Sequence, residues 1–218
     1  MNRLHIFTAC FCALLFVSKA SIAQKIELFN GKDLSGWNFV VDKNSVPADS
    51  VFTVRDGLIH VKGTLGYMYS QKKYRNYILK VSWRWYGEAT NSGIFLTLDE
   101  PKNPFPRAIE CQLAAGKAGD MVMLGGSDLK EYKAPPEGRP AFPKIEKMNA
   151  SSEKPVGEWN EAIIIVEDGK ITIFINGEYQ NRATSRIQSG HIGLQSEGKE
   201  IQFKNVSIVS LDGKVSQK

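Results

Sequence analysis

Two polar residues separated by one apolar residue are the clearest candidates for chemistry in this sequence. Glu110 and Gln112 alternate with the apolar Ile109 and Cys111. Successive side chains of a strand point to opposite faces, so Glu110 and Gln112 should share one face while their neighbours turn to the core. A carboxyl group beside an amide suits a sugar-binding cleft, with Glu110 as a general acid or base. The same pattern also suits a solvent-facing strand.

A second pair with the same spacing occurs near the end of the chain. Gln195 and Glu197 lie two residues apart, next to Gly198. Glu197 could act together with Glu110, because ordinary glycoside hydrolysis uses two carboxyl groups that flank the scissile bond. A charged loop tip is the alternative interpretation. Asp120 is a further acidic candidate for substrate binding.

Three other polar residues fit the binding of a sugar. Arg84 projects from the mixed face of an alternating stretch at 77–86, where it could stabilise an oxyanion or form a structural salt bridge. Asn91 and Ser92 precede Gly93 and could bond sugar hydroxyls or satisfy a turn. We expect one concave cavity to be lined by four side chains, namely Arg84, Glu110, Gln112 and Gln195.

Motifs for cofactors are absent from the sequence. Beyond the first 23 residues only His60 and His191 remain, without the spacing of zinc ligands. No Asp-rich calcium loop, phosphate loop or dinucleotide fingerprint occurs. We therefore predict no cofactor, and Ca²⁺ or another divalent metal stays open as the alternative.

The pattern of apolar residues predicts an all-β fold. Alternation with period two recurs along the chain, and Asp168-Gly169 and Asn176-Gly177 are typical hairpin turns. We expect strands at 51–54, 58–62, 67–70, 77–86, 93–98, 108–114, 121–124, 162–166, 171–175, 190–195 and 201–209. Many short strands and no helical period indicate a two-sheet antiparallel jelly-roll sandwich. Residues 134–155, rich in Pro, Glu, Lys and Ser, should form a long surface excursion.

The N-terminus has the layout of a secretory signal peptide. A weakly basic start precedes an apolar run, and small residues end at Ala23, so we expect residues 1–23 to be removed and 24–218 to form one domain. The apolar run is too short to span a membrane. Cleavage lowers the formal charge from +5 to +3, because Arg3 and Lys19 leave. That charge is spread without basic clusters, which argues against nucleic-acid binding. Cys111 alone remains, so no internal disulfide is expected.

Nine short phrases, in this order, resemble the 3-keto-disaccharide hydrolase (DUF1080) family. They are LFNGKDLSGW at 28–37, VRDGLI at 54–59, WRW at 83–85, NSGIF at 91–95, IECQ at 109–112, GEWN at 157–160, ING at 175–177, GHIGLQ at 190–195 and FKNV at 203–206. Many members carry a histidine where this chain has Glu197, and another shortly after the Glu-x-Gln phrase, where residues 114–120 contain none. If those histidines bind metal or move protons in relatives, this chain needs substitutes or lacks the activity.

The resemblance implies a concanavalin-like jelly roll, export to the periplasm or surface of a bacterium, and work on sugars oxidised at C3. Two functions follow. The first is an enzyme that cleaves 3-keto-glycosides by hydrolysis, or by elimination and hydration, with Glu110 or Glu197 as acid or base. The second is a non-catalytic carbohydrate-binding module on the same fold. A structural surface protein is a third alternative. The expected partner is a carbohydrate, and the sequence gives no oligomeric state.

Overall fold

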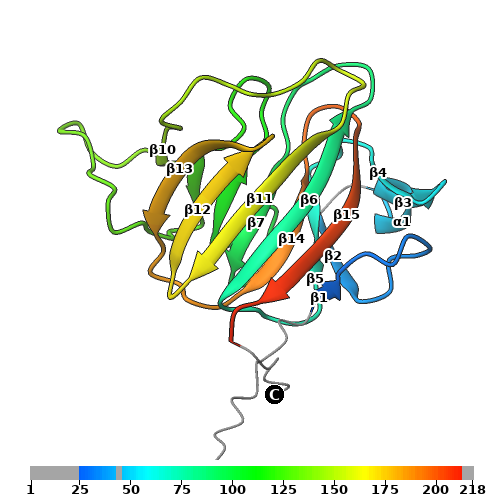
Figure 1. Cartoon of the computed structure of the whole chain (residues 1–218), viewed down its shortest axis with the longest axis horizontal. Coiled ribbons are helices and arrows are strands. Elements are labelled where there is room, and N and C mark those ends of the chain that lie inside the picture. Colours follow the sequence, from blue (N-terminus) through cyan, green and yellow to red (C-terminus); the bar gives the residue numbers. More distant parts are fainter. Residues whose placement is uncertain (1–24, 43–45, 213–218) are drawn as a thin grey trace, which may run out of the picture.

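The structure is a computed structural model that describes residues 25–42 and 46–212. The expected signal peptide, residues 1–23, lies outside this part. Two antiparallel sheets pack face to face and enclose the core (Figure 1). The predicted two-sheet sandwich is thereby confirmed. Its one described helix is a single turn, α1 (Ala48–Val51). None of the described helical residues forms a segment long and apolar enough for a membrane crossing.

The first sheet contains eight strands. Its path runs β13 (Glu178–Thr184), β12 (Lys170–Ile175), β11 (Asn160–Glu167), β6 (Tyr77–Trp85), β15 (Ile201–Ser210), β4 (Leu58–Val61) and β3 (Phe52–Arg55), and β1 (Lys25–Glu27) pairs with β15. The strands expected at 162–166 and 171–175 lie in β11 and β12, and β13 follows the turn at Asn176-Gly177. Asp168 and Asn176 adopt positive φ angles of 47° and 52° in the two turns, as the sequence predicted.

The second sheet contains seven strands and carries the candidate site. Its order is β10 (Lys144–Ile145), β9 (Met121–Leu124), β8 (Ala108–Gln112), β7 (Gly93–Leu98), β14 (His191–Ser196), β5 (Gly66–Ser70) and β2 (Trp37–Val41). Most of the predicted excursion at 134–155 is irregular, but β10 pairs with β9. The backbone N–H of Met123 also donates to the carbonyl of Pro143, at 2.8 Å. The excursion is therefore tied to the sheet edge.

Alternation along the strands decides which side chains enter the core. Tyr77, Leu79 and Trp83 of β6 are at most 1% exposed between the sheets, and full burial of one large apolar side chain stabilises the fold by about 1.5–3 kcal/mol. Ile109 and Cys111 of β8 belong to the same core cluster. Glu110 and Gln112 consequently lie on the outer face of the second sheet, as predicted.

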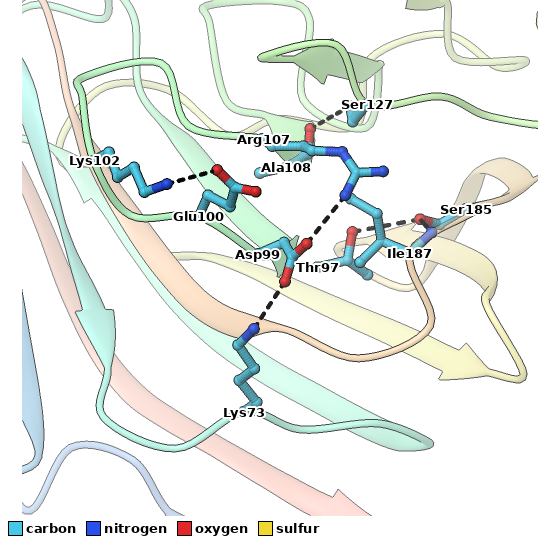
Figure 2. A network of polar contacts seen from close by, with 10 residues as sticks. All are labelled: Lys73, Thr97, Asp99, Glu100, Lys102, Arg107, Ala108, Ser127, Ser185 and Ile187. Atoms are coloured by element: carbon cyan, nitrogen blue, oxygen red, sulfur yellow. Dashed lines mark hydrogen bonds and ion pairs between the residues drawn. The ribbon is translucent and has the colours of Figure 1, made fainter.

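A paired carboxylate fixes the connection that leads into β8. Asp99, just after β7, accepts a hydrogen bond from Lys73 Nζ at 2.8 Å and one from Arg107 Nη1 at 3.0 Å (Figure 2). Nearby, Ser127 Oγ donates to the carbonyl of Ala108 at 2.7 Å. The hydrogen bond from Lys73 is the largest cause that lowers the pKa of Asp99. This network fixes the connection between β7 and β8.

Candidate active site

A cavity of about 260 Å³ opens on the outer face of the second sheet. Its walls come from β8, β9, β10, β14 and the segments beside them. The lining residues are Asn91, Phe105, Glu110, Gln112, Val122, Leu124, Phe142, Lys144, Gln195 and Glu197. A cavity of this kind, with a few convergent polar groups, is the usual form of a small-molecule site.

The carboxyl group of Glu110 occupies space that a glycine leaves free. A Cβ atom placed on Gly93 would lie 1.8 Å from Glu110 Oε1. Glu110 pairs with Phe95 across β8 and β7, so its side chain leans diagonally over Gly93. Any side chain at position 93 would displace the carboxyl group. Gly93 is therefore part of the site, although it offers no functional group.

Strand register brings the C-terminal pair to the same place. Leu194 of β14 pairs with Ile94 of β7, so the next residue, Gln195, lies beside Gly93. Two residues further along each strand, Asn91 and Glu197 form an antiparallel bridge. Residues separated by about a hundred positions in the sequence thus become neighbours around the Glu110 carboxyl group.

Several oxygen atoms in the cavity have no hydrogen-bond partner. Within the described residues, Asn91 Oδ1, Glu110 Oε1 and Gln195 Oε1 are buried and unpaired. Gln195 Nε2 donates to Glu197 Oε2 at 2.9 Å, which fixes the amide. A buried polar atom without a partner costs about 1–3 kcal/mol. Three such atoms around one cavity indicate a site that a polar ligand completes.

The environment of Glu110 changes its acidity. The residue is 2% exposed. Burial raises the pKa of Glu110 to about 8, and the negative charge of Glu197 adds to the effect. Desolvation disfavours the charged form of a carboxyl group. At neutral pH Glu110 is therefore mainly protonated and can donate a proton, whereas Glu197 lies in a half-buried position closer to solvent.

The structure brings together five of the eight predicted site residues. Glu110, Gln112, Asn91, Gln195 and Glu197 all line the cavity. The side-chain carbonyl of Gln112 accepts hydrogen bonds from the next two backbone N–H groups, each at 2.9 Å. Gln112 therefore stabilises the end of β8 as well as lining the wall.

Two predicted residues support the site from outside the cavity lining. Ser92 is fully buried, and its Oγ donates to the carbonyl of Gln195 at 2.9 Å. Asp120 is 3% exposed and accepts a hydrogen bond from the backbone N–H of Lys147 at 2.9 Å. Ser92 thus positions β14 against β7, and Asp120 anchors the excursion.

The expectation that Arg84 shares this cavity is wrong. Trp83 and Trp85 point between the sheets, so Arg84 leaves the sandwich on the far side of the first sheet. There its Nε donates to Gln202 Oε1 at 2.7 Å, and its guanidinium lies 4.7 Å from the ring centre of Trp159. Alternation predicted the correct face of β6, but the two sheets present their outer faces on opposite sides of the molecule.

Phe105, Phe142 and Lys144 line the cavity but were not predicted as site residues. Phe105 and Phe142 lie in irregular segments, where no strand period marks a facing side. The only available signal was the length of the excursion at 134–155, which contains Phe142 and Lys144.

The donor set of the cavity is oxygen-rich and contains no histidine. Within the described chain, no group of three or more His, Cys, Asp and Glu residues could hold a metal ion. His191 Nδ1 instead lies 2.7 Å from the carbonyl of Ser70, and His60 Nδ1 lies 3.1 Å from Glu200 Oε1 in the first sheet. Carboxyl and amide oxygens are ligands for hard cations such as Ca²⁺, so the predicted absence of a cofactor stays a prediction.

Comparison with known proteins assigns the chain to a family. The sequence model of the 3-keto-alpha-glucoside-1,2-lyase-like domain matches residues 24–209. The chain belongs to this family. A 3-keto-disaccharide hydrolase from Bacteroides thetaiotaomicron is 24% identical, over 86% of this chain and 78% of that protein. These matches confirm the family resemblance and support a carbohydrate-active, glycosyl hydrolase-like protein.

Solved structures with a similar fold include proteins described as glycosyl hydrolases and a β-glucanase. A candidate glycosyl hydrolase from Parabacteroides distasonis has a TM-score of 0.60 and 24% identity, over 86% of this chain and 94% of that chain. The β-glucanase of Bacillus licheniformis has a TM-score of 0.55 and 14% identity, over 86% of this chain and 97% of that chain. At these identities the likeness shows the jelly-roll fold alone.

Proposed function

We propose that this protein cleaves 3-keto-glycosides in the cavity around Glu110. The observation that carries the proposal is a buried carboxyl group with one unpartnered oxygen and a raised pKa, close enough to a second carboxyl group for the two to interact electrostatically. Two titratable groups whose environments differ in this way are typical of an acid and a base that act together. The family and the name of the Bacteroides thetaiotaomicron relative support the substrate class.

The ketone at C3 makes cleavage possible without an oxocarbenium ion. A base removes the proton from C2, and the electron pair is stabilised as the enolate of the ketone. The enolate then collapses, the bond between C1 and the leaving oxygen breaks, and a C1–C2 double bond forms. The leaving oxygen takes a proton, and one water molecule later adds across the double bond. The net reaction consumes one water and releases the 3-keto-sugar and the aglycone.

The two carboxyl groups can divide the proton transfers. Glu110, mainly protonated at neutral pH, can give its proton to the leaving oxygen. Glu197, nearer to solvent, can act as the base. Direct hydrolysis also needs one acid and one base, so the same assignment serves either route. In both routes Glu197 takes a position where many family members carry histidine.

The unpaired amide oxygens provide the sugar contacts. Asn91 Oδ1 and Gln195 Oε1 are acceptors without a donor among the described residues, and sugar hydroxyls are donors of the required kind. Gln195 also binds Glu197 through its Nε2 atom. The Gln195 amide would therefore link a bound sugar to the proposed base.

Release of the aglycone from a panel of 3-keto-glucosides tests the proposal. We expect turnover by the wild type and a rate lower by about 10²–10⁴ in Glu110→Gln and in Glu197→Gln. Arg84→Ala is the control, because Arg84 lies on the other sheet, and should keep wild-type turnover. Binding of the ketosugars with no release by the wild type would contradict catalysis and favour a binding module.

Export is a separate proposal that rests on the sequence of residues 1–23. N-terminal sequencing of protein from the periplasm or surface of the native host should give a mature chain that starts at about Gln24. Cytoplasmic protein with an intact Met1 would contradict export.

A further inference from the structure

The cavity has two unlike walls that meet along β8 and β9. Glu110, Gln195 and their polar neighbours form one wall. Val122 of β9 pairs directly with Glu110, and Leu124 lies two residues further along the same face. Phe105 and Phe142 extend this apolar side. A ligand that contacts Glu110 therefore has polar groups on one side of it and an apolar surface on the other.

Contacts within the protein hold the apolar wall together. The rings of Phe105 and Phe142 lie 5.0 Å apart between centroids at an angle of 57°. Phe105 packs against a second hydrophobic cluster on this face of the sheet, which includes Val122 and Leu124. Pro143, next to Phe142, is bonded to β9 through Met123. The aromatic pair is thus held in place from both sides.

Phe142 is nevertheless half exposed, at 50%. A large apolar ring left in contact with water beside a cavity is a feature of binding surfaces, because covering it with a ligand is favourable. A second sugar at this wall would bring several hydroxyl groups. Among the described lining residues on this side, only Lys144 offers a polar group, and its Nζ is paired with Glu146 at 2.8 Å. The chemistry of the wall fits an apolar ring better than a sugar.

We infer that the leaving group of the substrate is a hydrophobic ring, an aryl or arylalkyl alcohol, which packs against Phe105 and Phe142 while the 3-keto-sugar contacts Glu110 and Gln195. This inference rests on the proposed function and adds the class of aglycone to it. Phe142 is then a specificity-determining residue that takes no part in proton transfer.

The test compares leaving groups that differ in shape but not in acidity. Benzyl and methyl alcohol have nearly equal acidity, so benzyl and methyl 3-keto-glucosides differ mainly in the ring. We expect kcat/KM for the benzyl compound to exceed that for the methyl compound by about tenfold or more. Phe142→Ala should remove most of this preference, by about tenfold, and leave the methyl compound within about twofold. Tyr86→Ala is the matched control, because Tyr86 is also exposed, at 58%, but does not line the cavity.

A 3-keto-disaccharide is the third substrate. It distinguishes a wall that binds an apolar ring from a wall that stacks on a sugar. Equal kcat/KM for the benzyl and methyl compounds would overturn the inference while leaving the proposed function intact. An equal loss for the disaccharide and the benzyl compound in Phe142→Ala would also overturn it, because the ring would then stack on a sugar. If no compound is turned over, the proposed function fails, and calorimetric binding decides the inference. Tighter binding of the benzyl than the methyl compound, lost in Phe142→Ala, would support it, and equal binding would contradict it.

Discussion

Asp99 directly follows β7 and Glu110 lies within β8, and the surroundings of these two carboxyl groups are opposite. Asp99 is bonded to two cationic side chains, Lys73 and Arg107, which lower its pKa (Figure 2). Glu110 is buried, has one oxygen without a partner, and has a raised pKa of about 8. Asp99, which holds a loop, is paired and charged. Glu110, the proposed catalytic acid, has an oxygen without a partner and is mainly neutral.

The contrast between Asp99 and Glu110 shows that a carboxyl group that stabilises the fold and one that serves the site have different surroundings. Asp99 increases the free energy of unfolding, because its charged form is favoured in the folded state. Glu110 decreases the free energy of unfolding, because its ionisation is disfavoured in the folded state. Functional sites commonly retain groups that reduce stability in this way. Four predictions test the comparison.

The largest difference should appear in turnover. Glu110→Gln keeps the shape of the side chain and removes the acidic proton, so we expect kcat to fall by about 10²–10⁴. Asp99→Asn should leave kcat unchanged, because Asp99 does not line the cavity. Steady-state assays on both variants, with thermal melts to confirm folding, measure the contrast. Equal losses in the two variants would show that Glu110 has no special role.

A methyl group at position 93 should displace the Glu110 carboxyl group without unfolding the protein. The Cβ of Gly93→Ala would overlap the end of a flexible side chain, and a misplacement of about 1 Å can reduce a rate by about 10². We expect a loss of that size in kcat. The double variant Gly93→Ala/Glu110→Gln should be no slower than Glu110→Gln alone, because both changes act through one carboxyl group. Additive losses would contradict this mechanism.

The pH dependence of stability should report the raised pKa of Glu110. Between its ordinary pKa of 4.5 and about 8, the folded state binds a proton that the unfolded state has lost. The free energy of unfolding therefore falls as pH rises through this window and levels off above it. Glu110→Gln should lack this decrease and be more stable than the wild type by on the order of 3 kcal/mol at pH 7. Denaturant unfolding from pH 4 to pH 9 measures it, and parallel curves for the two proteins would contradict the raised pKa.

The smallest effect is expected from Asp99→Asn. Its ion pairs are partly exposed, with 28% of the Asp99 side chain accessible, so their loss should cost at most about 1 kcal/mol. The lowered pKa means that this stability is present above the ordinary value of 3.8 and is lost as pH falls through the folded value. The difference in denaturant stability between variant and wild type should therefore be larger at pH 7 than at pH 3. A large loss at both values would mark Asp99 as a packing residue.

Local rules predicted much of the fold. Alternation in Tyr77–Trp85 identified the buried face of β6, and the turns at Asp168 and Asn176 identified the hairpins. Strands β1, β2 and β10 were not predicted; β1 and β10, with three and two residues, are too short for a periodic signal. The turn α1 was missed for the same reason.

The site was predictable only where it depends on local alternation. The outward direction of Glu110 followed from Ile109 and Cys111. The sheet that contains Arg84 depends on the pairing of β6 with β11 and β15, which no local pattern reveals. The position of Phe142 depends on an irregular segment that is fixed by contacts with a strand edge. Contacts between distant parts of the chain thus decide the shape of the cavity.

A titration of carboxyl groups by carbon-13 NMR tests the central claim most directly, because it observes Glu110 and Asp99 in one spectrum. Resonances are assigned with Glu110→Gln and Asp99→Asn, each of which removes one signal. We predict a midpoint at about pH 8 for Glu110 and one below 3.8 for Asp99. A Glu110 midpoint near the ordinary value of 4.5 would contradict the account, because the residue would then be charged at neutral pH and could not serve as the acid.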